Sequence, residues 1–500
     1  MDQLTSINSQ QQSLLSIDEI RAFFKSNTTP IYLVGPTCFH LIGVEQWIPK
    51  LNFISHIDSF DGQCKHIFTP KETIRHEEFK SVVDVNNYLL SHPEVIDFIN
   101  NNGKPGDNGR VLFLKFNRQT EILAKKLHLK CCFPDSKTRN YLDNKLNTSA
   151  IAERADVPCV PNILAKVNSY AHLKPISSSL GTDLAIQTPF ENYGDNTFFI
   201  SKEEDYFKYA NTIEKERVVK IMKRHRNYKR AGIEACVTSQ GTIVAPLMTD
   251  IVGIEELTPY ESGWCGNEIY ANAFSDTIRK KARIYTQKFG KQLFKEGFRG
   301  YFELDFLIEN DEKKIYLYQL LPKISGISNL YNHAQFSKIE VPLFLFHMLE
   351  WMDIPFKIDI DALNNIWEKY NYNDEWSLLL IKHTLKTNEQ VTDTPASGIW
   401  KMKADGNISY KDFSTDQNAI EGKNEAFFFN IIRIGDYMFE GLNLGIIILR
   451  DRLMMDDFKL NQHSKKWINA FIAQYRSEIV ETISKPYSIR NHKKLNHYSL

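Results

Sequence analysis

The chain has 500 residues, more than one hydrophobic core usually covers, so we expect two to four domains. Sixty-one Lys and Arg residues balance sixty-one Asp and Glu residues, and a net charge of zero supplies no overall field that would hold a polyanion. We therefore expect no nucleic-acid partner. With 42% hydrophobic and 24% charged residues, the composition is that of a globular protein, which excludes disordered and collagenous classes.

The cysteines and the apolar segments indicate a compartment. Seven cysteines, an odd number, lie between residues 38 and 265 without a C-x2-C pair, which predicts reduced thiols rather than disulfides or a zinc site. The first twenty residues are polar and acidic, unlike an export signal. The most apolar stretch near the C-terminus, 442–449, is far shorter than the roughly 20 residues of a membrane span. We expect a cytoplasmic protein with no membrane partner.

Residues 1–140 are predicted to form an α/β domain. Apolar runs at 30–35 and 111–117 have strand length and are bounded by turn residues. Helical periodicity covers 80–102, with an interruption at Pro93, and returns at 121–127. Strands that alternate with helices in this way indicate a small parallel sheet.

Residues 141–358 are predicted to form a second unit, which follows a helix-rich segment that begins near 136. An amphipathic helix is expected over 275–298. The runs 300–310 and 315–326 are expected to form an antiparallel hairpin. Further strands are predicted at 184–190, 217–223 and 233–250, the last with a hairpin turn at 239–241.

Residues 359–500 are predicted to form a third, α+β unit. It begins with a helix, and the polar stretch 386–398 is interpreted as a linker. Beyond it we expect a hairpin that turns at Asp405-Gly406, two apolar strands and a helix around 464–483. The predicted fold class is therefore α/β and α+β multidomain.

Two carboxylates on the predicted hairpin are candidates for metal binding. Glu303 and Asp305 share one strand face, and the second strand brings Gln319 beside Asp305. Carboxylates so placed could hold Mg²⁺ against nucleotide phosphates. Acidic residues on an exposed strand face are also commonly just solvated, so both interpretations stay open.

Phosphate binding is the second candidate chemistry. The polar loop 191–197, which contains one glycine, could present backbone N–H groups to phosphate oxygens, or it could be an ordinary hairpin turn. Lys145, Lys220 and Lys223 could each place an ammonium near a phosphate, although surface lysines at the ends of elements are the default explanation.

The order of these features resembles the ATP-grasp superfamily, with the nearest similarity to biotin-carboxylase-like and carboxylate–amine ligase members. DNKLNTSAIAERADVPCVPN (143–162) and GYFELDFLIENDEKKIYLYQLLPKISG (300–326) carry the most specific match. The resemblance implies a pre-ATP-grasp domain over 1–140, a two-lobed ATP-grasp core over 141–358 and a C-terminal α+β domain over 359–500. It also implies ATP and Mg²⁺ as cofactors, a small carboxylate and an amine as substrates, and by analogy a homodimer.

The resemblance assigns the nucleotide-binding residues. Lys145 would approach the ATP phosphates, and Lys223 would lie where the strand that links the two lobes meets the adenine. Gln187 stands where the family usually has a second phosphate-binding lysine. The loop with Gly194 and Asp195 would close over the triphosphate.

The resemblance also assigns the metal and catalytic residues. Asp305 would be the first Mg²⁺ ligand, with Glu303 beside it, and Gln319 stands where the second ligand is normally Glu. Glu234 would face the phosphates or the metal, and Lys323 stands where an Arg binds the acyl-phosphate or carboxylate. Three further polar residues would lie towards the acceptor substrate or would cap a helix: Ser325, Asn329 and Asn332.

The second metal strand departs from the family pattern. Glu-x-Asn-Pro-Arg reads here as Gln-Leu-Leu-Pro-Lys over 319–323. An amide brings no negative charge, Leu321 cannot coordinate a metal, and Lys323 lacks the bidentate fork of Arg. Two functions therefore stay open. One is an ATP-dependent ligase that forms an amide through an acyl-phosphate on a small amino-acid-like or peptide substrate. The other is a catalytically impaired nucleotide-binding scaffold or regulator.

Overall fold

Four β-sheets organise the described part of the chain in the computed structural model. The described residues are 13–71, 74–75, 78–190, 197–225, 228–270, 272–370, 375–456 and 459–480. Within them, one sheet has eleven strands, and the others have five, four and three. A parallel sheet thus combines with antiparallel sheets and covering helices, which confirms the predicted α/β and α+β multidomain class.

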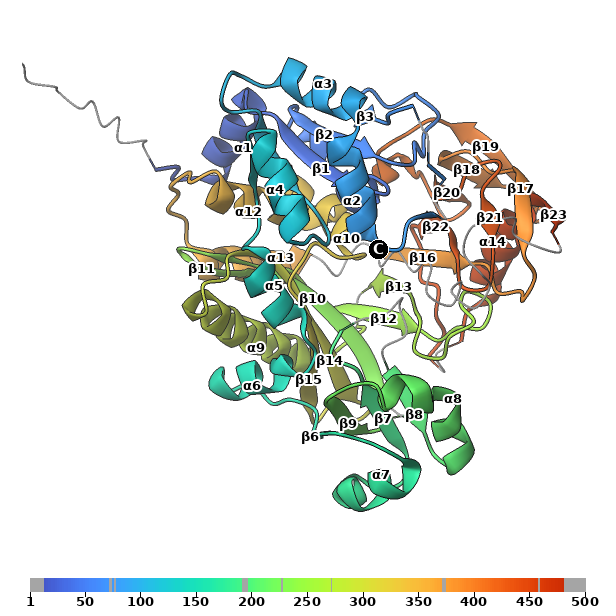
Figure 1. Ribbon diagram of the computed structural model, residues 1–500. Coiled ribbons are helices and arrows are strands. Elements are labelled where there is room, and N and C mark those ends of the chain that lie inside the picture. The colour runs from blue at the N-terminus through green and yellow to red at the C-terminus, as the bar shows by residue number, and fades with distance from the viewer. Residues whose placement is uncertain are drawn as a thin grey trace, which may run out of the picture.

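The five-stranded sheet is parallel and belongs to the N-terminal residues, as predicted. Its strands are β1 (Ile31–Gly35), β2 (Leu51–Ser55), β3 (Ile67–Phe68), β4 (Gly109–Leu112) and β5 (Leu129–Cys131), in the order β3-β2-β1-β4-β5. The helices around it are α1 (Ile17–Ser26), α2 (Val82–Ser91), α3 (Pro93–Asn102) and α4 (Arg118–Lys126) (Figure 1). Pro93 is the first residue of α3, where its missing N–H costs no hydrogen bond, so the predicted interruption is a boundary between two helices.

The eleven-stranded sheet forms the centre of the molecule (Figure 1). Its strands are β10 (Tyr228–Thr238), β11 (Gly241–Val244), β12 (Met248–Val252), β13 (Trp264–Ile269), β14 (Gly300–Glu309), β15 (Ile315–Leu321), β16 (Trp376–Lys382), β18 (Gly398–Met402), β19 (Ile408–Asp412), β20 (Glu425–Asn430) and β22 (Asn443–Leu449). Their order is β15-β14-β10-β12-β13-β16-β22-β20-β18-β19, and β11 pairs with β10. The hairpins predicted at 239–241, 300–326 and 405–406 are confirmed.

This central sheet crosses the predicted boundary at 358. β13 precedes the boundary and β16 follows it, and the two strands pair antiparallel from Gly266–Leu379 to Ile269–Trp376. The helices that follow the N-terminal unit are α5 (Ser136–Asp143), α6 (Asn147–Arg154), α9 (Asp276–Lys295), α10 (Ser328–His333), α11 (Gln335–Ile339), α12 (Leu343–Trp351) and α13 (Ile360–Tyr370). The division into domains at 140 and 358 stays a prediction.

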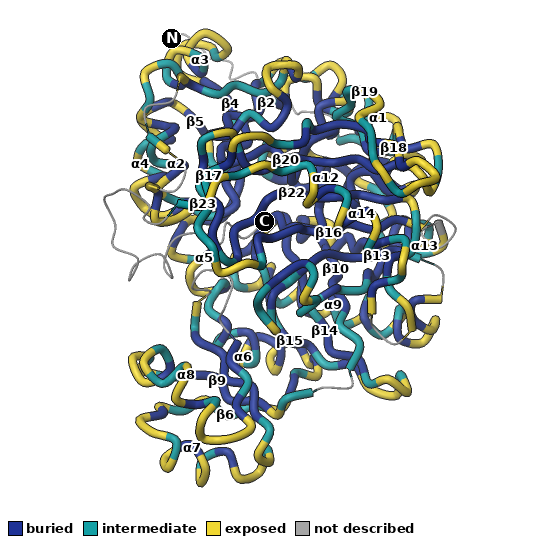
Figure 2. The backbone as a smooth tube through the Cα atoms, turned by 90° about the vertical axis from the view of Figure 1, so that its right-hand side faces the viewer, coloured by how far each residue is buried: buried dark blue, intermediate teal, exposed yellow. Residues whose placement is uncertain are grey.

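The four-stranded sheet projects from the rest of the molecule, as Figures 1 and 2 show. Its strands and helices are β6 (Asn162–Ala165), α7 (Tyr170–Ile176), β7 (Leu184–Gln187), β8 (Thr197–Ile200), α8 (Glu203–Ile213) and β9 (Val219–Lys223), and the strand order is β6-β9-β7-β8. Backbone hydrogen bonds attach it to β15, from Val160 N–H to Leu317 O at 2.9 Å and from Leu317 N–H to Pro158 O at 2.8 Å. The edge of the central sheet therefore lies against the small sheet.

The three-stranded sheet corrects two predictions for the C-terminal part. It consists of β17 (Glu389–Asp393), β21 (Tyr437–Met438) and β23 (Arg476–Ile479). The segment 386–398 is not a linker, because β17 lies within it and is anchored by the buried Val391. The helix predicted over 464–483 is α14 (Gln462–Ile472), and β23 then pairs with β17. Pairing with a strand more than eighty residues away overrides the local helical period.

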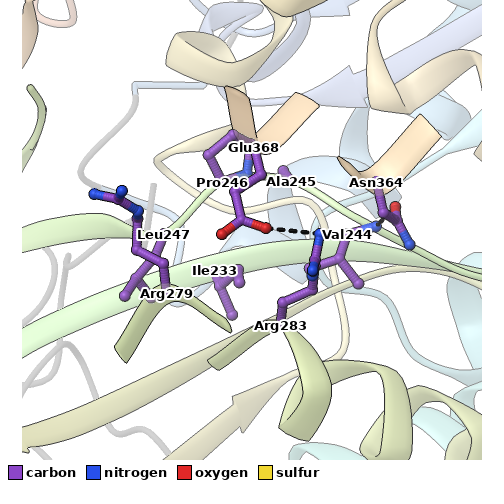
Figure 3. Close-up of a pocket in the computed structure, with 9 residues that line it drawn as sticks. All are labelled: Ile233, Val244, Ala245, Pro246, Leu247, Arg279, Arg283, Asn364 and Glu368. Carbon is purple, nitrogen blue, oxygen red and sulfur yellow. Dashed lines mark hydrogen bonds and ion pairs between the residues drawn. The ribbon is translucent and has the colours of Figure 1, made fainter. Parts of the chain in front are cut away.

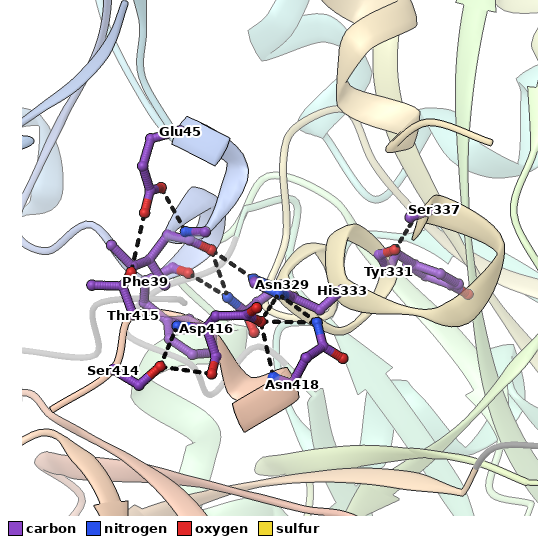
Figure 4. Close-up of polar contacts among 12 residues, drawn as sticks. Phe39, Glu45, Asn329, Tyr331, His333, Ser337, Ser414, Thr415, Asp416 and Asn418 are labelled. Carbon is purple, nitrogen blue, oxygen red and sulfur yellow. Dashed lines mark hydrogen bonds and ion pairs between the residues drawn. The ribbon is translucent and has the colours of Figure 1, made fainter. Parts of the chain in front are cut away.

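A group of polar contacts joins α10 to the N-terminal unit and to a segment near residue 416 (Figure 4). The His333 ring bonds the Ile42 carbonyl through Nε2 at 2.8 Å and Asp416 Oδ1 through Nδ1 at 3.1 Å. The Thr415 hydroxyl donates to Glu45 Oε1 at 3.3 Å. Segments from three distant parts of the sequence are thus fixed to one another.

All seven cysteines are free thiols, as predicted. Among the helices of the described ranges, none is long and apolar enough to cross a membrane.

The join between β13 and β16 generates a stability prediction. Gly266 has φ +145°, and an added Cβ would collide with the backbone carbonyl of Leu378 on β16. We expect Gly266→Ala to destabilise the protein by about 2–4 kcal/mol, because the two strands must separate to admit the methyl group. Thermal unfolding of the purified protein measures this. Gly422→Ala is the control, since its Cβ would meet nothing within 4 Å. Equal melting temperatures for the two variants would contradict the prediction.

Candidate active site

The predicted face of β14 carries two carboxylates into the interior. Phe302 and Leu304 point into a hydrophobic cluster, whereas Glu303 and Asp305 lie on the opposite face. Asp305 is paired with Gln319 on β15, and the Gln319 amide donates a hydrogen bond to Asp305 Oδ2. Glu303 is 5% exposed and Asp305 is half-buried, so the interpretation as a merely solvated strand face is wrong.

Two neighbouring strands complete a group of four carboxylates. Glu234 on β10 pairs with Glu303, and Asp250 approaches from β12. A Cβ placed on Gly232 would lie 2.9 Å from Glu303 Oε1 and 3.1 Å from Asp250 Oδ1, so the glycine leaves the space these carboxylates occupy. Asp250 was not among the residues expected from the sequence, where its signal is an acid between apolar residues of the strand MTDIV.

The carboxylate group is strongly desolvated. Burial raises the pKa of Glu234 to about 7 and raises those of Asp250, Glu303 and Asp305, and the repulsion of Asp305 raises the pKa of Glu303 further. The Ser325 hydroxyl donates to Glu234 Oε1 at 2.8 Å and partly offsets this effect. Such a group favours a proton or a bound cation beside it.

The oxygen donors on β14 and β15 suit one divalent cation. Glu303 and Asp305 supply carboxylate oxygens, and the Gln319 side chain supplies an amide oxygen. Across the described ranges, no group of three or more His, Cys, Asp or Glu side chains is arranged to hold a metal ion. The residues therefore fit a single Mg²⁺ whose coordination is completed by phosphate and water oxygens, rather than a site built from protein ligands alone.

Two buried lysines face the carboxylates from the other side of β15. Lys145, between α5 and α6, is 2% exposed, and its Nζ donates to the Leu320 carbonyl at 3.2 Å. Lys220 on β9 is fully buried, and its Nζ donates to the Tyr318 carbonyl at 3.3 Å. Neither lysine forms an ion pair with an acid that the structure describes. Burial lowers the pKa of Lys220, which is the expected cost of an ammonium without a counter-ion.

Gln187 lies between the lysines and the carboxylates. Its Nε2 is 3.4 Å from Thr197 Oγ1 and 3.4 Å from Gln319 Oε1. Its Oε1 is buried without a hydrogen-bond partner among the described residues. The structure thus brings together five of the residues considered from the sequence, which come from the two sheets and from the α5–α6 connection: Lys145, Gln187, Lys220, Asp305 and Gln319.

Other predicted residues lie elsewhere. Lys223 is exposed at the end of β9, and Gly194 and Asp195 lie outside the described residues. Lys323 is 3% exposed and lies near His40 of the N-terminal unit. Burial, followed by the charge of Lys323, lowers the pKa of His40 to about 3. The roles assigned to these residues by the resemblance stay predictions.

A separate cavity lies near the other face of β10 (Figure 3). Ile233 lines it from that strand, while Arg283 and Glu368 close one wall with an ion pair at 2.6 Å. Arg279 also lines it and donates to the Phe274 carbonyl at 2.8 Å. Arg283 and Glu368 thus neutralise each other within this cavity.

The raised pKa of Glu234 makes stability depend on pH. Below the ordinary pKa of 4.5 the carboxyl is protonated whether or not the chain is folded, so it carries no penalty. As pH rises to 7, the folded protein must keep the proton or bury a charge, and stability falls. We expect Glu234→Gln to gain about 3 kcal/mol over the original protein between pH 4.5 and pH 7.5. Denaturant unfolding across this range measures the difference, and a flat or falling difference would refute the assignment.

The comparisons with known proteins agree with this architecture. No protein-family model matches the sequence, and neither does any curated protein. Among solved structures, the biotin carboxylase domain of Hydrogenobacter thermophilus 2-oxoglutarate carboxylase, with MgADP, ADP and bicarbonate, has a TM-score of 0.58 at 9% identity and covers 91% of this chain and 92% of its own. Biotin carboxylase from Campylobacter jejuni has a TM-score of 0.57 at 10% identity, with 90% and 92% covered.

A second group of similar structures consists of N5-carboxyaminoimidazole ribonucleotide synthetases. N5-carboxyaminoimidazole synthase from Aspergillus clavatus, solved with ADP and 5-aminoimidazole ribonucleotide, has a TM-score of 0.54 at 13% identity. It covers 89% of this chain and 99% of its own. The likeness extends over all three predicted units. The chain therefore has the overall fold of these structures, in line with the fold that the resemblance to the ATP-grasp superfamily implies.

Proposed function

We propose that the chain is an ATP-dependent ligase that joins a small-molecule carboxylate to an amine. The observation that carries this proposal is the buried pair of lysines opposite a desolvated carboxylate group, where the two sheets meet. The lysines favour an anion and the carboxylates favour a cation, so a nucleoside triphosphate with Mg²⁺ would satisfy both. The ADP and MgADP in the similar structures support the same choice.

Each group in the site has a role in phosphoryl transfer. Lys145 would bind phosphate oxygens, while Asp305 and Glu303, with the Gln319 amide, would hold Mg²⁺. Mg²⁺ supplies charge neutralisation at the phosphate oxygens. Phosphoryl transfer needs little covalent help from a protein, so position and charge provide most of the rate enhancement.

The proposed reaction has two steps. A substrate carboxylate attacks the γ-phosphorus of ATP to give an acyl-phosphate and ADP. The amine then attacks the acyl carbon, forms the carbon–nitrogen bond and expels phosphate. Lys323 would hold the acyl-phosphate or carboxylate, and Glu234, with a pKa of about 7, can exchange a proton near neutral pH. We propose an amino-acid-like or peptide acid as substrate and a homodimer as the assembly.

Hydroxylamine trapping tests this function without knowledge of the amine. The protein would be incubated with ATP, Mg²⁺, hydroxylamine and pools of carboxylic acids, including bicarbonate. Acyl-phosphate formation would be detected as ADP release and, for organic acids, as the hydroxamate. We expect Lys145→Gln and Asp305→Asn to lower acid-dependent ADP release by about 100-fold or more, because each removes a charge from the transfer site. Lys215→Gln, an exposed change between α8 and β9, is the control.

The outcomes separate the two functions left open by the sequence. ADP release that depends on an added acid supports the ligase. An ATP-dependent rise in melting temperature without ADP release from any pool would indicate a nucleotide-binding scaffold instead. No rise with ATP and Mg²⁺ would contradict both.

Gln319 generates a separate prediction about the metal. Gln319→Glu adds a carboxylate beside Asp305, so Mg²⁺ binding gains a negative ligand. We expect half-maximal Mg²⁺ activation, or half-maximal stabilisation by MgATP, at a concentration about 10-fold lower. Gln119→Glu, an exposed change on α4, is the matched control and should leave the Mg²⁺ requirement unchanged. A higher Mg²⁺ requirement in Gln319→Glu would mean that this position does not face the metal.

A further inference from the structure

The register between β7 and β9 places Lys220 beside Gln187, the position at which the resemblance implies a lysine. Gln187 is directly opposite Lys220 in the antiparallel pair, and both side chains are fully buried. Side chains directly opposite in such a pair have Cβ atoms about 5 Å apart. An ammonium on β9 can therefore reach the same ligand atom as an ammonium on β7.

The hydrogen bonds show where this ammonium lies. Lys220 Nζ donates to the carbonyl of Tyr318, and Lys145 Nζ donates to the carbonyl of Leu320. Carbonyls two residues apart on a strand point in the same direction, so the two ammonium groups lie along one edge of β15. Gln319 lies between these carbonyls, and its amide bonds Asp305. The lysines thus flank the side chain that leads to the proposed metal.

The ammonium of Lys220 is buried without a counter-ion among the described residues, which is an arrangement that an anion would stabilise. It forms no ion pair with any acid of the described ranges, and its described hydrogen-bond partner is a neutral carbonyl at 3.3 Å. Burying an ammonium in this way costs free energy unless a counter-charge arrives. If Lys220 had only a structural role, an apolar side chain of similar length would fill the same space without burying a charge.

We propose that Lys220 supplies the second ammonium for the β- and γ-phosphates of the nucleotide. The lysine expected at position 187 is replaced, in space, by one on the neighbouring strand. The inference rests on the proposed function, because it names a residue of the same phosphate site. Gln187 keeps a hydrogen-bonding side chain at this position. It donates to Gln319 Oε1 on β15 and so connects β7, the neighbour of β9, to the central sheet.

Exchange of the two residues tests the inference. The variants are Lys220→Met, which removes the charge at similar length, and the double exchange Gln187→Lys with Lys220→Gln, which returns the lysine to β7. Binding of ATP with Mg²⁺ and of AMP would be measured by calorimetry, with Lys215→Gln as the exposed control. AMP is the internal reference because it lacks the β- and γ-phosphates.

We expect Lys220→Met to weaken ATP binding by about 10- to 100-fold and to leave AMP binding unchanged, since one charge-assisted contact to phosphate is lost. The double exchange should restore most of the ATP affinity. In the absence of nucleotide, Lys220→Met should melt at the same temperature as the original protein or higher, because a buried unpaired charge is gone.

Three different results would overturn the inference. Unchanged ATP affinity in a folded Lys220→Met variant would mean that Lys220 does not bind phosphate, while the proposed function would stand. Failure of the original protein to bind ATP would overturn the proposed function and this inference together. Equal losses of ATP and AMP affinity would assign Lys220 a structural role instead.

Discussion

The site depends on one constraint: carboxylates and ammonium groups are buried close together where the four-stranded sheet meets the central sheet. Four carboxylates with raised pKa values come from β10, β12 and β14, whereas the two ammonium groups come from the α5–α6 connection and β9. Desolvated like charges repel, so each group is stable there only while the other faces it or a ligand intervenes. Lys220 and the backbone of Pro158 and Val160 form polar contacts between the four-stranded sheet and β15.

The two amides of the site are best understood as a pair. Relative to the pattern that the resemblance implies, Gln187 stands for a cation and Gln319 for an anion, and their side chains meet at 3.4 Å. Neutralising one member of an opposite pair would leave the other charge buried and uncompensated, which is costly, whereas neutralising both keeps the balance. These two departures from the family pattern therefore cancel in charge.

Local patterns in the sequence predicted the parts of this structure that depend on neighbouring residues. The alternation in 300–310 predicted both the β14–β15 hairpin and the shared face of Glu303 and Asp305. Strand neighbours distant in the chain were not predictable, because periodicity does not say which strands pair. This explains why Asp250 and the pairing of Gln187 with Lys220 were missed, and why β17 and β23 were taken for a linker and a helix.

The continuous central sheet determines how the C-terminal part relates to the rest. β16 pairs with β13, so these last strands extend the sheet that carries the carboxylates and are not a separately tethered module. A chain that stopped after α13 would lack β16, so backbone groups along one edge of β13 would lose their hydrogen-bond partners. Leu378 and Leu380 would also no longer cover the apolar groups around this edge. Such an edge recruits other strands, so a fragment of this kind would self-associate through β-pairing instead of remaining a minimal enzyme.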